Sequence, residues 1–270
     1  MVSEDIAVVF DVAGTILRMY RVAKDIRRGI LLENVVTCEL ITAKRGLALI
    51  VPQIDPASVA AFDPDEPIAS LIAGREDRVE ISCSSSPISR DAALSILRSS
   101  QARVSELQEA NSVVKARCPD KYQTTGMIID EDLREVTFAL STGGTPFPGL
   151  SEVLSDLECL GADVYVASGD SMRSLTSLED YGIDLNRVCA VATPGRKQQL
   201  IMRLKERYKR VVMVGDGLND LHALQAADLG VLTVQQYTRP AMNLLQAADE
   251  IITDLRELPE ILKSRCTDPT

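Results

Sequence analysis

Two carboxylates stand four residues apart in Gly215-Asp216-Gly-Leu-Asn219-Asp220, which follows the apolar run VVMV. Carboxylate oxygens that bracket a glycine turn suit a hard octahedral cation such as Mg²⁺, which keeps several waters. The stretch is too short for an EF-hand loop. A buried strand that runs into this pattern has few structural uses, so this is the most specific chemical signal in the chain. It predicts a Mg²⁺ site at Asp216 and Asp220, with Asn219 beside it.

Asp11 follows a second apolar run, IAVVF, and opens the pentad Asp11-Val-Ala-Gly14-Thr15. A carboxylate at a strand end can attack phosphorus as a nucleophile and can ligate Mg²⁺ through its other oxygen. Gly14 permits a tight turn, and Thr15 offers a hydroxyl and a backbone N–H to a phosphate. An Asp that caps the next helix is the alternative, and the pentad alone is weak evidence.

Two further motifs could contact a phosphoryl group. The Ser168 hydroxyl and the backbone N–H of Gly169 follow the run DVYVA and can hold phosphoryl oxygens, although a helix N-cap is the better explanation of this motif alone. Lys197 stands at the start of a predicted helix and can neutralise both the phosphate and Asp11. Arg196 could take this role in place of Lys197. Alternatively, Lys197 is a solvated surface lysine without a role in chemistry.

Together the four motifs supply a nucleophile, hydroxyl and amide donors, a cation and a carboxylate-bound metal. A trigonal, highly negative phosphoryl transition state requires these parts for its stabilisation. Each motif is ambiguous by itself, but four of them at successive strand ends are hard to obtain by accident. The sequence therefore predicts phosphoryl transfer.

A doubly wound, parallel α/β sheet is the predicted fold of the part that positions these motifs. Strand and helix patterns alternate from about Gly149 onward, as in βαβ units with right-handed crossovers. Ligands of such sheets bind outside the carboxyl ends of the strands, where all four motifs fall. The expected strands are Ile6–Asp11, Asp163–Ser168, Arg187–Val191, Arg210–Gly215, Leu229–Leu232 and Ile251–Thr253. The expected helices are Leu150–Leu160, Ser171–Tyr181, Gly195–Tyr208, Leu218–Ala226 and Arg239–Ala247.

An inserted α+β cap domain is predicted for residues 19–123, which break this rhythm. Residues up to Val51 favour two to four antiparallel strands, and the prolines of Asp55–Pro67 indicate a loop. Ser89 is a credible N-cap for a helical stretch running towards Lys115. Thr124–Leu140 looks like a hairpin that returns the chain to the core. The expected core is therefore residues 1–18 and 124–270.

Composition excludes several other classes of function. The net charge of −10 would repel a phosphate backbone, so we expect no nucleic acid as partner. The six cysteines form no CxxC pair, and His222 is the one histidine. A zinc site with cysteine and histidine ligands and a histidine-based catalytic triad are therefore both excluded. The acidic N-terminus is unlike a signal peptide, and no apolar run is long enough for a membrane helix. We expect a cytoplasmic protein with reduced thiols.

On these motifs the chain resembles the haloacid-dehalogenase superfamily, whose four motifs match FDVAGT, VASGD, Lys197 and VGDGLND in order. The resemblance covers the first strand and turn and everything from about Gly126 on. Within the superfamily the chain looks most like the phosphorylation domain of P-type ATPases. Four stretches are similar to sequences of that group, namely MVGDGLNDLHAL, the SGD turn, PFPG and DLRELPEIL. A soluble P-type-ATPase-like phosphatase describes this pattern best.

The resemblance implies a role for each site residue. Asp11 would attack phosphorus, Thr15 and Ser168 would hold the phosphoryl group, and Lys197 would balance its charge. The implied Mg²⁺ ligands are the Asp11 carboxylate, the Ala13 carbonyl and Asp216, with support from Asp220 and Asn219.

Position 13 departs from the family pattern. Phosphatases of the superfamily usually carry an acid–base Asp there, P-type ATPases a Thr and phosphonoacetaldehyde hydrolases an Ala, which is the residue in this chain. Loss of a general acid–base group typically removes about 10²–10⁴-fold in rate. We therefore expect slow turnover, a long-lived phospho-Asp11, a substrate with a good leaving group, or another group that substitutes.

Three functions remain open on the sequence. The favoured one is a Mg²⁺-dependent phosphohydrolase that forms a phospho-aspartyl intermediate on a small phosphorylated metabolite. The second is a phosphonatase-like hydrolysis of a carbon–phosphorus bond, which would need a Schiff-base lysine from the cap. Lys24 and Lys44 are candidates for it only because they are lysines in the predicted cap. The third is a low-turnover regulatory or binding protein that retains the metal site. No nucleotide-binding motif stands in Met19–Gln123, and the sequence leaves the natural substrate and the oligomeric state open.

Overall fold

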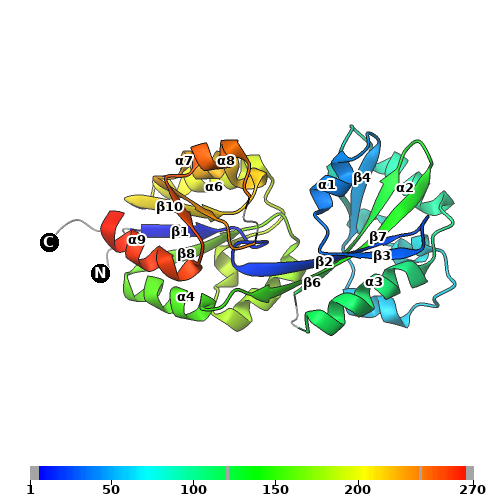
Figure 1. Ribbon diagram of the computed structural model, residues 1–270, viewed down its shortest axis with the longest axis horizontal. Helices are drawn as coiled ribbons and strands as arrows, with labels where there is room; N and C mark the ends of the chain where they lie inside the picture. The colour runs from blue at the N-terminus through cyan, green and yellow to red at the C-terminus, as the bar shows by residue number, and fades with distance from the viewer. Residues whose placement is uncertain (1–5, 120–121, 237–238, 266–270) are drawn as a thin grey trace. The chain divides into compact units, whose positions relative to one another are not determined.

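The computed structural model describes residues 6–119, 122–236 and 239–265. The chain folds into two compact units, one made of Met1–Met19 with Thr145–Thr270 and the other of Tyr20–Gly144. Each unit contains its own sheet and helices (Figure 1). The predicted fold class, a parallel α/β core with a separate α+β domain, is confirmed.

The sheet of the first unit is parallel in every strand pair and has six strands among the described residues. β1 lies at its centre, and all five of its side chains are buried, as expected for a strand covered on both faces. The order across the sheet is β12 (Glu250–Ile252), β11 (Leu229–Thr233), β10 (Arg210–Gly215), β1 (Ile6–Phe10), β8 (Ala162–Ala167) and β9 (Val188–Cys189).

Helices cover both faces of this sheet (Figure 1). One face carries α6 (Pro194–Lys205), α7 (Leu221–Ala226) and α8 (Met242–Ala247), and the other carries α4 (Leu150–Cys159) and α9 (Leu258–Arg265). Apolar side chains of α6, α7 and α8 pack on alternate residues of β1 and β10 in one buried cluster. Short 3-10 segments complete the connections, namely η5 (Leu185–Arg187), η6 (Leu218–Asp220) and η7 (Leu255–Glu257).

Several predicted elements of this unit are shorter or less regular than expected. The predicted helix Leu218–Ala226 begins with the 3-10 segment η6, and α8 begins at Met242 instead of Arg239. The predicted helix Ser171–Tyr181 divides into α5 (Met172–Leu175) and the 3-10 segment η4 (Thr176–Tyr181). Hydroxyls compete there for backbone carbonyls, because Thr176 donates to the Arg173 oxygen and Ser177 to the Ser174 oxygen. The predicted strand Arg187–Val191 shrinks to the two residues of β9.

The second unit has a six-stranded sheet among its described residues, and its pairs β2–β3, β4–β5, β4–β6 and β6–β7 are antiparallel. The strand order is β3 (Ile30–Glu33), β2 (Leu17–Asp25), β7 (Glu135–Pro146), β6 (Gln123–Asp130), β4 (Leu47–Pro52) and β5 (Val79–Ser84). Its helices are α1 (Thr37–Thr42), α2 (Arg90–Ser99) and α3 (Val104–Arg117), with 3-10 segments η1 (Pro56–Ala61), η2 (Ile68–Ile72) and η3 (Glu76–Arg78).

The helical stretch predicted from Ser89 to Lys115 is two helices. Ser89 is the N-cap of α2 and accepts a hydrogen bond from the Ala92 backbone N–H, as predicted. The stretch breaks at Ser100, whose backbone is extended and whose buried hydroxyl accepts from the backbone N–H groups of Ala102 and Val136. The side chain of Ser100 thus replaces helical hydrogen bonds and ends the first helix.

The predicted domain boundaries differ from the compact units. The hairpin that was expected to belong to the core, β6 with β7, lies in the sheet of the second unit, so the first unit resumes at Thr145 instead of residue 124. Met127, Ile129 and Ala139 of this hairpin share a buried cluster with Leu97 and Leu107. The local apolar pattern reveals a hairpin, but only packing decides which sheet it joins.

Among the described segments, every helix is too short or too polar to span a lipid bilayer.

Candidate active site

Three adjacent strands carry the predicted motifs to one edge of the first sheet. β1 lies between β8 and β10, and Phe10 is in register with Val166 and Val214. Asp11 therefore follows β1 beside the ends of both neighbours, and its backbone N–H donates to the Val214 oxygen at 2.9 Å. Residues that are far apart in the sequence meet here, as expected for the carboxyl edge of a parallel sheet.

Lys197 joins two of the acidic residues. Its Nζ donates to Asp11 Oδ1 at 2.5 Å and to Asp220 Oδ1 at 2.7 Å. All three side chains are almost completely buried, with 0% to 3% exposed. α6 places the lysine there, because Thr193 caps the helix and Pro194 occupies its first turn. Lys197, and not its rival Arg196, therefore lies in the site; Arg196 is exposed and donates to the Val191 oxygen.

Asp220 organises the loop after β10. Its second oxygen, Oδ2, accepts from the backbone N–H groups of Asp216 and Gly217 at 3.3 and 3.2 Å. A Cβ at position 215 would lie 2.7 Å from the Asp220 side chain, so glycine is required where this carboxyl folds back. Both Asp220 oxygens thus have protein partners, one on Lys197 and the other on the loop.

The Asp216 carboxylate lies against Gly14. Gly14 has φ of +86°, a conformation that favours glycine, and a Cβ there would stand 1.9 Å from Asp216 Oδ2. The turn after β1 thereby leaves room for a second acidic side chain beside Asp11. Carboxylate oxygens of Asp11, Asp216 and Asp220 all lie within 4.8 Å of one another.

This donor set fits a hard divalent cation. Oxygens of three carboxylates lie close together there, and their residues are buried or half-buried. Mg²⁺ takes oxygen ligands and usually binds through one or two carboxylates plus water. The carboxylate oxygens that such an ion needs are therefore present.

Thr15 presents a hydroxyl without a protein partner. The residue is 0% exposed, and its Oγ1 makes no hydrogen bond within the described part of the chain. A buried polar group left unsatisfied costs roughly 1–3 kcal/mol, so such groups call for an explanation. An acceptor such as a phosphoryl oxygen would satisfy this hydroxyl.

Ser168 directly follows β8 and is 1% exposed. Its hydroxyl donates to Asp170 Oδ2 at 2.8 Å and accepts from the Asp170 backbone N–H at 3.2 Å. Asp170 is not among the predicted site residues, although the Ser-x-Asp spacing within the motif was a usable signal. The neighbouring Gly169 is exposed.

Burial and charge perturb the titration of the central pair. Burial, and after it the charge of Asp220, raise the pKa of Asp11 to about 7, although Lys197 opposes this shift. Burial works to lower the pKa of Lys197, yet Asp11 and Asp220 raise it above its ordinary value. The lysine therefore stays charged, and Asp11 is the group that takes up a proton in the metal-free protein.

Some predicted residues lie apart from this buried cluster. Asn219 is exposed and Ala13 is half-buried, and neither side chain reaches the ion pairs of Lys197. The single histidine, His222, is exposed on α7.

The two cap lysines are both held as ion pairs in the second unit. Lys24 Nζ donates to Glu109 at 2.6 Å, and Lys44 Nζ donates to both Asp130 oxygens at 2.9 and 2.7 Å. Hydrogen bonding to Asp130 raises the pKa of Lys44. A Schiff-base lysine needs the opposite shift, so the geometry of Lys44 does not favour phosphonatase chemistry.

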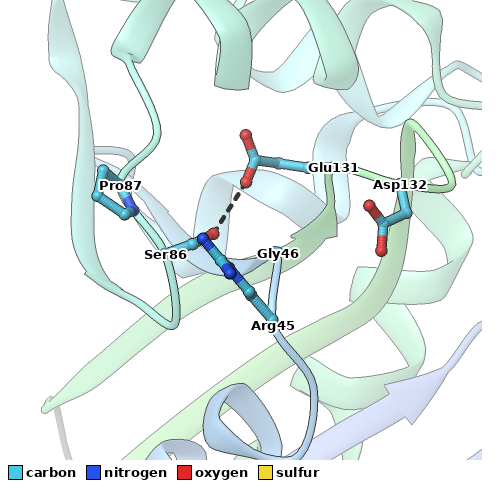
Figure 2. A pocket seen from close by; sticks show the side chains of 6 residues that line it. All are labelled: Arg45, Gly46, Ser86, Pro87, Glu131 and Asp132. Carbon is cyan, nitrogen blue, oxygen red and sulfur yellow. Dashed lines mark hydrogen bonds between the residues drawn. The ribbon is translucent and has the colours of Figure 1, made fainter.

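A hollow of about 270 Å³ lies in the second unit and contains none of the predicted site residues. Figure 2 shows the hydrogen bond of 3.0 Å from the Ser86 hydroxyl to Glu131 at its edge. The hollow is lined by Arg45, Gly46, Ser86, Pro87, Glu131 and Asp132.

Three known proteins show what this chain is similar to. The catalytic domain of the CPx-ATPase CopB-B has a TM-score of 0.49 at 16% identity, covering 98% of this chain and 91% of that one. The probable copper-transporting ATPase PacS of Synechocystis is 34% identical over 112 residues, which is 42% of this chain and only 15% of the ATPase. A soluble P-type ATPase-like phosphatase of Methanocaldococcus jannaschii is 32% identical over 260 residues, or 96% of this chain and 93% of that protein.

The model of a haloacid dehalogenase-like hydrolase family matches residues 7–228, a stretch that includes Asp11, Ser168, Lys197, Asp216 and Asp220. This match and the archaeal relative together show that the chain belongs to the haloacid dehalogenase-like hydrolases.

Proposed function

We propose that this hydrolase is a Mg²⁺-dependent phosphatase that transfers the phosphoryl group of a small phosphorylated molecule to Asp11 and then to water. The buried Asp11–Lys197–Asp220 ion-pair network beside the unpartnered Thr15 hydroxyl is the observation that carries the proposal. The archaeal relative, whose name describes a phosphatase, supports the same reaction class.

Asp11 is the proposed nucleophile because it lies at the strand edge with one oxygen held by Lys197. Lys197 would neutralise charge on the phosphoryl group as that group approaches a buried carboxylate. The Thr15 hydroxyl would donate to a phosphoryl oxygen, and the backbone N–H of Gly169 would assist it. These donors stand in place before reaction, which lowers the cost of reorganisation.

Mg²⁺ would be held by the carboxylates of Asp11 and Asp216 and by the Ala13 carbonyl, and it would supply positive charge against the phosphoryl oxygens. Asp220 fits a supporting role better than a direct one, because both of its oxygens already have protein partners. Exposed Asn219 would act at the edge of the site and not within it.

The partner we propose is a small phosphorylated metabolite, with neither nucleic acid nor a membrane. The negative net charge argues against nucleic acid. A cytoplasmic location stays a prediction from the sequence.

Phosphate release from p-nitrophenyl phosphate and acetyl phosphate, with and without Mg²⁺, tests this function. We expect wild type to release phosphate and to carry a phosphoryl adduct by intact mass. Asp11→Asn should lose both, while the matched surface variant Asp132→Asn should keep both. Equal rates in wild type and Asp11→Asn would favour a regulatory or binding protein. A borohydride-trapped lysine adduct with phosphonoacetaldehyde would favour the phosphonatase.

A further inference from the structure

The loop after β11 is tied to the beginning of the chain by one side chain. Gln236 Oε1 accepts from the Met19 backbone N–H at 2.9 Å, and Gln236 Nε2 donates to the Met19 oxygen at 3.2 Å. The two residues are separated by 217 positions in the sequence. A primary amide carries an acceptor and a donor side by side, so it can pair with both backbone groups of one residue, as a neighbouring strand does.

This amide takes the place of a strand partner for Met19. β3 pairs with β2 over Val22–Asp25, so its ladder does not extend to Met19. Met19 is only 6% exposed, and buried backbone groups need hydrogen-bond partners. Gln236 supplies both partners at the residue where the opening segment of the first unit ends.

Met19 lies two residues beyond the nucleophile turn, which we define as residues 12–17. The Val12 oxygen accepts from the Leu17 N–H at 3.0 Å, and the Leu17 oxygen accepts from the Gly14 N–H at 2.8 Å. These reciprocal hydrogen bonds close the turn into one unit. A shift of the backbone at Met19 is therefore passed through Leu17 to Gly14.

The nucleophile turn has an anchor at each end. At its entry, the Asp11 N–H donates to the Val214 oxygen at 2.9 Å and ties the turn to β10. At its exit, the anchor is the Gln236 amide. Gly14 lies between the two anchors, and a Cβ on it would stand 1.9 Å from Asp216 Oδ2. Because this clearance is so small, the Asp216 carboxylate keeps its place only while the turn keeps its own.

We propose that Gln236 is a positioning residue of the metal site, which holds the nucleophile turn so that Gly14 leaves room for the Asp216 carboxylate. This inference rests on the function proposed above, in which Asp11 and Asp216 bind Mg²⁺. Residues that hold metal ligands in place typically contribute about 10–100-fold to metal affinity or activity, although they do not touch the ion. Gln236 acts in this way through the backbone of Met19.

The neighbouring glutamine provides a matched control. Gln235 is half-buried like Gln236, and its side chain also makes two hydrogen bonds. Its Oε1 accepts from the Leu255 backbone N–H at 3.1 Å, and its Nε2 donates to Thr233 Oγ1 at 3.0 Å. Gln235 thus ties the same loop to the start of η7, whereas Gln236 ties it to the exit of the nucleophile turn.

Calorimetric Mg²⁺ titrations of Gln236→Met and Gln235→Met at pH 8 test the proposal. Met keeps the length of the side chain and removes both hydrogen-bonding groups. We expect Gln236→Met to bind Mg²⁺ at least about tenfold more weakly than wild type, and Gln235→Met to bind it as wild type does. The midpoints of urea unfolding of the two metal-free variants should be similar, because each loses two side-chain hydrogen bonds. Gln236→Asn, whose amide is one methylene shorter, cannot reach both backbone groups of Met19 and should also bind Mg²⁺ weakly.

Amide hydrogen exchange of the metal-free protein gives a second readout. Gln236→Met should speed exchange at the Met19 and Gly14 N–H groups, whereas Gln235→Met should speed it at Leu255 and leave the other two unchanged. With p-nitrophenyl phosphate and saturating Mg²⁺, Gln236→Met should also form the phosphoryl adduct about tenfold more slowly than wild type.

Wild-type Mg²⁺ affinity in Gln236→Met would limit this glutamine to a structural role, and an equal loss of affinity in Gln235→Met would indicate a general effect of destabilisation. Either result overturns the proposal. The proposed function fails separately if wild type binds Mg²⁺ but never carries a phosphoryl adduct, and the Mg²⁺ affinities then still decide the role of Gln236.

Discussion

At the scale of single residues, the site is dominated by one buried ammonium shared between two carboxylates. Lys197 is 0% exposed and bonds Asp11 and Asp220 at once. Breaking a buried ion pair by removing one partner is strongly destabilising, because the remaining charge is left without compensation in a low dielectric. The same lysine therefore contributes to stability and to chemistry.

Lys197→Met should destabilise the metal-free protein at pH 8 by about 3–5 kcal/mol. Met matches the length of the lysine stem, so the loss reports mainly on charge. At pH 5 the loss should be smaller, because Asp11, with a pKa of about 7, is then protonated and needs no cation. Urea unfolding at both pH values measures this, and Lys263→Met serves as the control, because the Lys263 side chain on α9 is exposed. A loss independent of pH would contradict the role of charge.

The raised pKa of Asp11 also predicts how Mg²⁺ affinity depends on pH. The ordinary pKa is 3.8 and the folded, metal-free value is about 7, so Asp11 holds a proton between these limits that Mg²⁺ must displace. Affinity should fall about tenfold per pH unit below pH 7 and level off above it. Because the folded protein binds this proton more tightly than the unfolded chain does, protonation of Asp11 stabilises the metal-free protein. This stabilisation is complete below pH 3.8 and is lost as the pH rises through 7.

Calorimetric Mg²⁺ titrations at pH 5.5, 6.5 and 8 measure this dependence. Asp11→Asn should bind Mg²⁺ weakly with a flat profile over the same range, because Asn does not titrate there. An equally steep profile in Asp11→Asn would assign the proton to another group.

At the scale of elements, glycine turns after β1 and β10 let acidic side chains approach one another. Gly14 and Gly215 each leave space that a Cβ would fill, and the occupants of that space are the carboxyl groups of Asp216 and Asp220. Parallel strands bring these turns to one edge, and glycine allows them to touch.

Gly14→Ala should weaken Mg²⁺ binding at least tenfold, because its Cβ would displace the Asp216 carboxylate. Gly29→Ala is the matched control: Gly29 also has positive φ, at +68°, but nothing lies within 4 Å of its Cβ position. Both variants should lose about 1–2 kcal/mol of stability from backbone strain. Only Gly14→Ala should lose Mg²⁺ affinity in calorimetry, and equal affinities would remove Gly14 from the site.

At the scale of the whole molecule, the described chain divides into a parallel unit that contains every predicted site residue and an antiparallel unit that contains none of them. A ligand that binds the folded first unit and not the unfolded chain adds to its stability by mass action. Metal binding should thus be visible in unfolding experiments without any substrate.

Mg²⁺ at a hundred times its Kd should stabilise the protein by about 2.7 kcal/mol. Asp216→Asn should abolish this gain at the same Mg²⁺ concentration, since it removes a proposed ligand and leaves the Lys197 network intact. Asp132→Asn, an exposed acidic residue of the second unit, should retain it. Urea unfolding with and without Mg²⁺ measures the difference, and a similar gain in all three proteins would indicate non-specific binding.

The sequence alone determined the parallel core, since β1, β8 and β10 are short apolar runs that end in polar motifs, and such runs are typical of strands buried on both faces. It also identified the residues that meet at the strand ends, because the carboxyl edge of such a sheet is fixed by topology. These signals are local, since apolarity and turn residues act over a few positions.

Only the tertiary structure decided which sheet the hairpin β6–β7 joins and which residues pair in the site. Lys197 and Asp11 are separated by 186 positions in the sequence, and the pattern of neither residue specifies the other. The pairing of Asp220 with Lys197 depends on side-chain directions within a packed edge. Long-range contacts of this kind arise from the competition of many buried surfaces for partners, and that competition is resolved only when the whole chain is folded.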